Sequence, residues 1–261
     1  MVYQACPYPL FADNALKDRV YLLTGASSGI GAATAALLFS LGAKVILVGR
    51  DREKLDCVSG MWHPSSFYTL ELDLALPGSL YDSVKSLPHE WLPLHGAFHS
   101  AGAEFVRPVR LTKPADFDSL MATSVRSAFD LGRVAATKAL MHEGGALIYM
   151  SSVAAITGTT GLALYSATKG SIEALVRSLA IELAPRHIRV NAITSGAIQT
   201  PMHDRLTASL SKEAVDDYQR RHPLGFGKPS DISQLAVFLL SDAGRWITGS
   251  SIVADGGYSV L

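Results

Sequence analysis

Short runs of apolar residues, mostly Val, Ile and Leu, recur from one end of the chain to the other. Within each run the apolar residues are continuous and do not alternate with polar ones, which is typical of strands buried on both faces of a sheet. Seven such runs predict strands, at Val20–Leu23, Val45–Val48, Phe67–Leu70, Gly96–His99, Ala146–Met150, Val190–Ile193 and Ile252–Ala254.

Longer segments with helical spacing separate these runs, for example around residues 117–131 and 172–179. Alternating strands and helices predict βαβ units and a parallel sheet covered by helices on both faces. We therefore expect an α/β fold: a three-layer, Rossmann-type, doubly wound parallel sheet of about seven strands, in a single domain over residues 1–261. One long segment without sheet character, near 195–228, is expected to form a substrate loop.

Charge and composition exclude several classes of protein. Lys and Arg together number 23, as do Asp and Glu, so no net charge attracts the chain to nucleic acid or an anionic membrane. No apolar run approaches the roughly 18 residues that span a membrane, and the N-terminus does not resemble a secretory signal. We expect a cytoplasmic protein that binds neither nucleic acid nor membrane. Cys6 and Cys57 are expected to be free thiols, without a disulfide framework or a metal site.

A glycine-rich turn follows the first predicted strand and leads into an alanine-rich helix. Glycines allow positive φ and close approach of a ligand, while a helix N-terminus presents free N–H groups and the positive end of its dipole. The turn therefore suits a dinucleotide pyrophosphate, although a tight connection without a ligand is the alternative. The candidate cofactor-binding residues here are Gly25, Ser27, Ser28, Gly29, Ile30 and Gly31.

Three further residues, Ser152, Tyr165 and Lys169, have a spacing that makes the glycine-rich turn easier to interpret. Tyr165 and Lys169 are four residues apart, which places them on one face of a helix. Ser152 lies thirteen residues before Tyr165, at the end of a predicted strand. Together with the turn TGxxxGxG, this spacing resembles the short-chain dehydrogenase/reductase family, in its compact single-domain branch, similar to 3-oxoacyl carrier-protein ketoreductases. The resemblance implies that Ser152, Tyr165 and Lys169 are catalytic.

The chemistry of ketone reduction requires these residue types. Hydride transfer builds negative charge on the carbonyl oxygen, which Ser152 would hold and Tyr165 would protonate as general acid and base. A free phenol has a pKa of about 10. A cation at ~4 Å contributes about 4 kcal/mol at an effective dielectric of 20, or roughly three pKa units. We therefore expect Lys169, helped by a positive nicotinamide, to bring the pKa of Tyr165 near 7.

The resemblance also implies further contacts with the cofactor. Gly49 stands where NAD-using relatives carry an acid, and Arg50 can pair with a 2′-phosphate, so NADP(H) is favoured over NAD(H). Asp73 would lie beside the adenine, or it could simply cap the turn that follows. Ser124 stands where relatives have a relay Asn, or it is a helix-packing residue. The other implied contacts are Leu74, Ser100, Ala101, Gly102, Gly196, Ile198 and Thr200, besides Tyr165 and Lys169 themselves.

These features predict an NADP-dependent oxidoreductase acting on a small-molecule carbonyl or secondary alcohol. The alternatives are an epimerase or dehydratase of sugar nucleotides, and a catalytically weak dinucleotide sensor. The family resemblance also implies a homo-oligomer, tetramer or dimer, in which helices at Asp116–Met141 and Tyr165–Ala184 pair through small residues. Residues expected at these contacts are Ala128, Gly132, Ala135 and Ala136, and those expected around the substrate are Thr159, Thr160, His203, Arg205, His222 and Phe226.

Overall fold

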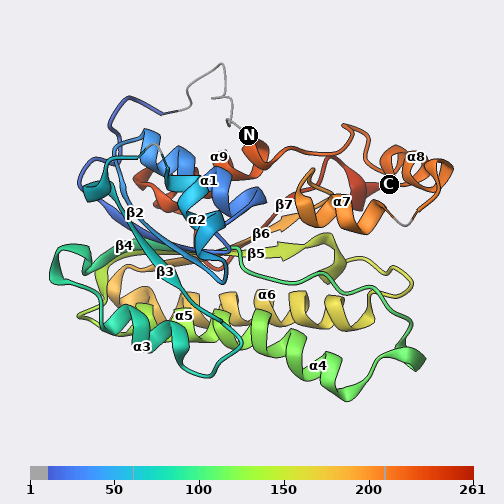
Figure 1. Ribbon diagram of the computed structural model, residues 1–261, viewed down its shortest axis with the longest axis horizontal. Helices are drawn as coiled ribbons and strands as arrows, with labels where there is room; N and C mark the ends of the chain where they lie inside the picture. The colour runs from blue at the N-terminus through green and yellow to red at the C-terminus, as the bar shows by residue number, and fades with distance from the viewer. Residues whose placement is uncertain (1–10, 61, 209) are drawn as a thin grey trace.

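All seven predicted strands are present in one parallel sheet. The computed structural model describes residues 11–60, 62–208 and 210–261. Cys6 lies outside the described residues, and Cys57 is free and exposed. The order of the strands across the sheet is β3-β2-β1-β4-β5-β6-β7 (Figure 1). Their bounds are β1 Val20–Thr24, β2 Lys44–Gly49, β3 Phe67–Glu71, β4 Leu94–His99, β5 Met141–Ser152, β6 Arg189–Ser195 and β7 Ser251–Ala254.

Helices cover both faces of the sheet, which confirms the three-layer, single-domain fold. Successive strand residues point to opposite faces, so Leu22 packs into one core cluster while its neighbour Leu23 packs into the other. Helices α1 (Gly29–Ser40), α2 (Arg52–Ser59) and α9 (Pro229–Leu240) lie on one side in Figure 1. The other side carries α3 (Ser79–Lys85), α4 (Pro114–Met121), α5 (Ser127–Ala136) and α6 (Ala163–Leu183).

The helix predicted to reach Met141 ends five residues earlier. A π-helical turn, Ala122–Arg126, joins α4 to α5, and α5 ends at Ala136. Thr137 has extended backbone angles, with φ −87° and ψ 114°, so the helix cannot continue through it. Met141 begins β5, where it pairs with Leu94 of β4. The expected bound was wrong because burial of this apolar residue in the sheet outweighs its local helical pattern.

The small residues of α5 pack within the chain. Ala128, Gly132 and Ala135 are buried. A Cβ on Gly132 would lie 2.9 Å from Leu179 Cδ1 of α6, so the glycine brings these two helices together. The expectation that these three residues line a contact between subunits was therefore wrong. The outward faces of the same helices carry large apolar side chains instead: Phe117, Phe129 and Ile181.

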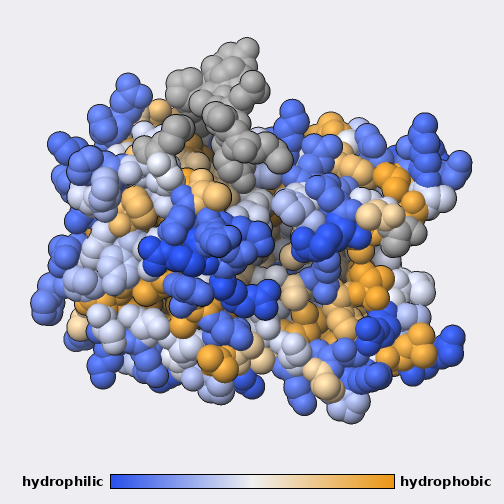
Figure 2. Space-filling model, in the orientation of Figure 1, coloured by the Kyte–Doolittle hydropathy of each residue, from blue (hydrophilic) through white to orange (hydrophobic). Residues whose placement is uncertain are grey.

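The segment after β6 is helical where a loop was expected. It contains α7 (Pro201–Thr207) and α8 (Lys212–Arg220), and a bridge between Ile198 and Gly227 closes its base. In Figure 1 both helices lie to one side of the sheet, beyond the ends of β5 and β6. None of the helices described is long and apolar enough to cross a membrane. Figure 2 shows that hydrophilic side chains cover most of the face in view.

Candidate active site

A cavity of about 1190 Å³ lies at the carboxyl ends of the strands. Strand β1 pairs with β2 on one side and β4 on the other, so chain order reverses here, which is where doubly wound sheets bind their ligands. All the predicted catalytic and cofactor-binding residues line this cavity except Gly31 and Ser124. Within the described part of the chain, no group of three or more His, Cys, Asp or Glu residues is arranged to hold a metal ion.

The glycine turn has the geometry that a pyrophosphate needs. Gly25 and Gly29 adopt positive φ, of 67° and 55°. A Cβ on Gly25 would lie 2.8 Å from the backbone nitrogen of Ala101, and one on Gly31 would collide with the Gly25 carbonyl oxygen. Ser28 precedes α1 without capping it through its side chain, which leaves the start of the helix open to a ligand. Gly31 thus shapes the turn from behind, and the turn fits a dinucleotide.

The end of β2 carries a glycine, a cation and an acid in succession: Gly49, Arg50 and Asp51. A Cβ on Gly49 would lie 3.1 Å from Leu55 Cδ2, so a side chain there would require Leu55 to shift by a few tenths of an ångström. Asp51 caps α2 by accepting from the Lys54 amide at 3.1 Å, and it pairs with Lys54 Nζ at 2.6 Å. Arg50 is exposed and forms no ion pair with any residue that the structure describes. The free cation at this edge is therefore Arg50.

Asp73 caps the turn that follows β3, and its place beside the adenine stays a prediction. It lies just beyond β3 and lines the cavity. One of its carboxylate oxygens also accepts from the Ala75 amide at 2.9 Å, which caps the turn that follows. The side chain is thereby fixed at the edge of the cavity, next to the buried Leu74.

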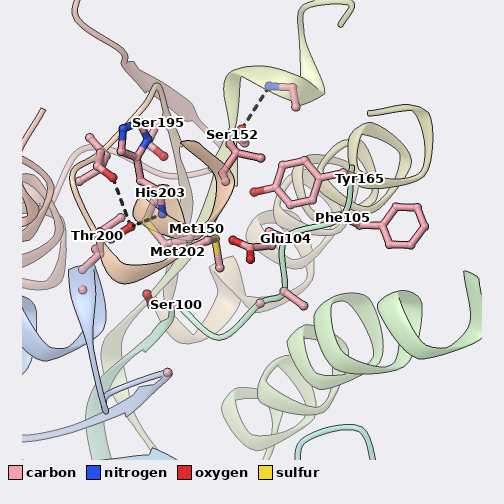
Figure 3. Close-up of a pocket in the computed structure, with 18 of the residues that line it drawn as sticks. Ser100, Glu104, Phe105, Met150, Ser152, Tyr165, Ser195, Thr200, Met202 and His203 are labelled. Carbon is pink, nitrogen blue, oxygen red and sulfur yellow. Dashed lines mark hydrogen bonds between the residues drawn. The ribbon is translucent and has the colours of Figure 1, made fainter. Parts of the chain in front are cut away.

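Ser152, Tyr165 and Lys169 meet between β5 and α6. Ser152 ends β5, and its Oγ accepts from the Ala154 amide at 3.2 Å. Tyr165 and Lys169 lie on one face of α6, with Lys169 Nζ 5.6 Å from the centre of the tyrosine ring. Lys169 is buried and donates to the Met150 carbonyl at 2.9 Å. Figure 3 shows the Tyr165 hydroxyl beside Ser152.

The protein's own groups keep Tyr165 protonated. Burial raises the pKa of its phenol to about 12, against a smaller lowering by the Ser152 hydroxyl; the charges of Tyr218 and Glu104 raise it further. Burial also lowers the pKa of Lys169 to about 8. The expected pKa near 7 for Tyr165 is therefore not produced by Lys169 within the protein, because burial disfavours the phenolate more than its neighbours stabilise it.

Ser124 lies away from the cavity, in the π-helical turn. It is buried, and its carbonyl accepts from Ser127 Oγ at 3.4 Å. Ser127 Oγ also lies 2.8 Å from Nε2 of His99, at the end of β4. Burial, and then the charge of Lys169, lower the pKa of His99 to about 3. A neutral, buried histidine therefore lies between Lys169 and this turn, a feature that sequence reasoning missed.

The wall opposite the glycine turn comes from the segment after β6. His203 and Arg205 of α7 line the cavity, as do Thr159 and Thr160. His222 does not: it is buried, its Nδ1 lies 3.0 Å from the Tyr218 carbonyl, and its Nε2 accepts from the Ala197 amide at 3.2 Å. Phe226 is also outside the cavity lining and packs on His203, with ring centres 4.6 Å apart. His222 and Phe226 thus pack behind the residues that line the cavity and do not line it themselves.

Sequence reasoning also missed an acidic residue in the cavity. Glu104 follows β4, two residues after Gly102, and lines the cavity with Phe105 and Met150. Its Oε1 accepts from Arg205 Nε at 3.0 Å, which joins the segment after β4 to α7. No motif marks this residue. Its position just beyond the carboxyl end of a central strand was the one signal that could have identified it.

Comparisons with known proteins agree with this geometry. The family model described as enoyl-(acyl carrier protein) reductase matches residues 25–259. The chain is 33% identical to the 3-oxoacyl-[acyl-carrier-protein] reductase FabG of Rickettsia felis over 93% of this chain and 97% of that protein. A solved short-chain dehydrogenase/reductase from Brucella melitensis, described as a glucose/ribitol dehydrogenase, superposes with a TM-score of 0.87 at 30% identity, covering 95% of this chain and 99% of that one. A short-chain dehydrogenase from Burkholderia cenocepacia, solved in complex with NADP, gives 0.86 at 26% identity, with 94% and 99% covered.

Proposed function

The chain belongs to the short-chain dehydrogenase/reductase family of oxidoreductases, and we propose that it uses NADP(H) to interconvert a carbonyl and a secondary alcohol. The observation that carries this proposal is the meeting of Ser152, Tyr165 and Lys169 in the cavity that the glycine turn also lines. The match over nearly the full length of the Rickettsia felis reductase favours this reaction over the larger sugar-nucleotide enzymes.

Each of the three side chains has a part in the proposed mechanism. The bound nicotinamide supplies or takes up the hydride. Ser152 accepts from the Ala154 amide and keeps its own hydroxyl proton, which it would donate to the substrate oxygen. Tyr165, which keeps its proton at neutral pH, gives that proton to the same oxygen as negative charge develops. Lys169 places a positive charge near the phenolate that remains.

Three observations support NADP(H) over NAD(H). Arg50 lines the cavity and forms no ion pair with the described residues. Position 49 is a glycine and so carries no carboxylate, and the carboxylate of Asp51 is already paired with Lys54. A 2′-phosphate would find a partner in Arg50, whereas the ribose hydroxyls of NAD would find no free carboxylate at the end of β2. The similar dehydrogenase from Burkholderia cenocepacia was solved in complex with NADP, which also supports this cofactor.

The test is Tyr165→Phe, assayed with NADPH and a panel of ketones. We expect the turnover number to fall by about 100- to 10,000-fold because the proton donor is lost. The dissociation constant for NADPH should change less than about threefold, since the fold and the glycine turn are retained. Turnover close to that of the unchanged protein would contradict the assignment of Tyr165. NADPH binding without oxidation by any ketone would instead favour a dinucleotide sensor.

We also propose that the protein is a homo-oligomer, a tetramer or a dimer, assembled through α4, α5 and α6. Phe117, Phe129 and Ile181 are 49%, 54% and 78% exposed on these helices, which is a large apolar area to leave in water. Light scattering should give a mass of two or four chains, and Ile181→Asp should reduce it. A single-chain mass for the unchanged protein would refute the assembly. The cytoplasmic location stays a prediction.

A further inference from the structure

A buried carboxylate joins α6 to two strands of the sheet. Glu173 lies on α6, four residues after Lys169, and is only 8% exposed. Its Oε1 accepts two hydrogen bonds, from Ser151 Oγ at 2.9 Å and from Thr194 Oγ1 at 2.7 Å. Ser151 and Thr194 are paired neighbours in β5 and β6, and both are buried. One carboxylate oxygen therefore connects one helix to two adjacent strands.

The places of these contacts on β5 connect them with the proposed chemistry. Lys169 donates to the Met150 carbonyl at 2.9 Å. One turn further along α6, Glu173 accepts from Ser151, which is the next residue of β5. The residue that follows, and ends the strand, is Ser152. Two successive turns of the helix are thus held to the two residues that precede the proposed catalytic serine.

Apolar packing and hydrogen bonding constrain α6 in different ways. The buried face of the helix carries Ile172 and Val176, whose apolar contacts favour burial but have no preferred direction. Hydrogen bonds weaken steeply when their distance or angle changes. The two hydrogen bonds of Glu173 therefore set where along the sheet the helix lies. The distance between Tyr165, on the same helix, and Ser152 depends on that position.

A carboxylate is unfavourable to bury. A buried charge must be well hydrogen-bonded, and an apolar side chain of similar size with apolar partners is often as stable. Stability alone therefore does not explain why Glu173 stands at this contact. Accurate placement of α6 does, because a reacting group that is misplaced by about 1 Å can lower a rate by about 100-fold.

We propose that Glu173 is a positioning residue for the carbonyl reduction: it anchors α6 to β5 and β6 and so holds the Tyr165 hydroxyl beside Ser152. This inference rests on the proposed function and deepens it. Glu173 acts through the helix and does not touch the substrate, since it lies outside the cavity lining. Figure 3 shows the arrangement of Tyr165 and Ser152 that Glu173 maintains.

Three substitutions separate the reach of the side chain from its charge. Glu173→Gln keeps an amide oxygen at the same reach, Glu173→Asp keeps the charge on a shorter side chain, and Glu173→Met removes the acceptor. With NADPH in excess and the ketone that the unchanged protein reduces best, we expect kcat to fall by about 10- to 100-fold in Glu173→Asp and Glu173→Met. Glu173→Gln should keep kcat within about threefold of the unchanged protein. Glu143→Met is the control, since Glu143 is exposed on β5 and lies outside the cavity lining, and its kcat should not change.

Urea unfolding separates positioning from stability. The triple variant Ser151→Ala, Glu173→Met, Thr194→Val makes all three partners apolar, so none of these side chains leaves a buried polar atom without a partner. The midpoint of unfolding should therefore stay close to that of the unchanged protein. We expect kcat in this variant to fall as far as it does in Glu173→Met.

The pH profile gives a readout that a loss of stability would not move. The Ser152 hydroxyl lowers the pKa of Tyr165, and this effect is lost if α6 moves away from Ser152. Oxidation of the alcohol product with NADP needs the phenolate, so its rate rises with pH. In Glu173→Met this rise should lie about one pH unit higher, whereas Glu173→Gln should keep the original profile.

Several outcomes would overturn the positioning role. These are an unchanged kcat in Glu173→Met, an unchanged pH profile in a slow Glu173→Met, or a greater loss in Glu173→Gln than in Glu173→Asp, which would assign the effect to charge. A triple variant that is as active as the unchanged protein would do the same. Each leaves the proposed function standing, because ketones are still reduced. Full turnover by Tyr165→Phe would overturn the proposed function and this inference together.

Discussion

The two halves of the cavity are built in different ways. The cofactor half consists largely of backbone: the turns after β1, β2 and β4, with glycines at which a Cβ would meet neighbouring atoms. The substrate half consists of side chains from α7, α8 and the segment after β4. The shape of the cofactor half depends on the path of the backbone, and the shape of the substrate half depends on contacts between side chains. Backbone constraints leave a spacing of glycines in the sequence, whereas side-chain contacts between distant segments leave none.

Among the changes that test this comparison, the largest effect is expected in the cofactor half. In Gly31→Ala the added Cβ would meet the Gly25 carbonyl oxygen, so the turn must open. We expect the affinity for NADPH to fall by about 100-fold, as overpacking of roughly 3 kcal/mol implies. Fluorescence titration with NADPH measures it. Gly170→Ala is the matched control: nothing lies within 4 Å of its Cβ, and in helix α6 it should stabilise the protein by about 0.5–1 kcal/mol. NADPH binding as tight as in the unchanged protein would show that the turn is not a backbone cradle.

The buried end of β4 should be sensitive to acid. The pKa of His99 is lowered from 6.5 to about 3 in the folded protein, so below pH 6.5 the unfolded chain takes up a proton that the folded one resists. The contribution of His99 to stability is present above pH 6.5 and is lost as the pH falls toward 3, by about 1.4 kcal/mol per pH unit.

Urea unfolding at pH 7 and pH 4.5 measures this loss. His99→Asn should reduce the difference between the two free energies by roughly 2–3 kcal/mol. His95, whose pKa burial lowers to about 4, acts in the same direction and is present in both proteins. Equal pH dependence in the two proteins would mean that His99 is not held neutral by the fold.

A side chain at the rim of the cofactor half should have a smaller effect. Arg50→Ala should lower kcat/KM with NADPH by about 10- to 50-fold, since hydrogen bonds to charged groups are worth roughly 1.5–3 kcal/mol. The values with NADH should not change. Steady-state kinetics with both cofactors test this, and a similar loss with each would assign Arg50 a role other than phosphate binding.

The smallest effect is expected in the substrate half. Arg205→Ala breaks an ion pair whose cation is 62% exposed, and such pairs contribute about 0–1 kcal/mol to stability. KM for the ketone should rise a few-fold while the dissociation constant for NADPH stays the same. If the dissociation constant for NADPH changed as much as KM for the ketone, the ion pair in the substrate half would also affect the structure of the cofactor half.

The difference between the halves also explains what the sequence predicted. All seven strands and the positions of Gly25, Tyr165 and Lys169 follow from patterns within short segments, and the structure has them as expected. The local sequence pattern does not show which polar side chains from distant segments come into contact. Glu104 meets Arg205, and His99 meets Ser127, only in the fold.

Errors arose where local patterns fit two environments. Met141 continues a helical pattern but is buried in the sheet, opposite Leu94. Gly132 suits a close approach of helices between subunits as well as within one, and it packs against Leu179 of α6 in the same chain. Ser124 could be a relay residue or a helix-packing residue, and its burial in the π-helical turn, outside the cavity lining, favours the second.

The strand order has a consequence for synthesis on the ribosome. The first strand to emerge, β1, lies in the interior of the sheet, and each later strand adds outward: β2 and β3 on one side, then β4 to β7 on the other. The glycine turn, Arg50 and Asp73 all emerge before β4. A nascent chain halted after β4 already holds most of the cofactor half beside its neighbouring strands, whereas α7 and α8 emerge only after β6. Truncations from the C-terminus should therefore remove β7 and α9 first, then α8 and α7, and the glycine turn last.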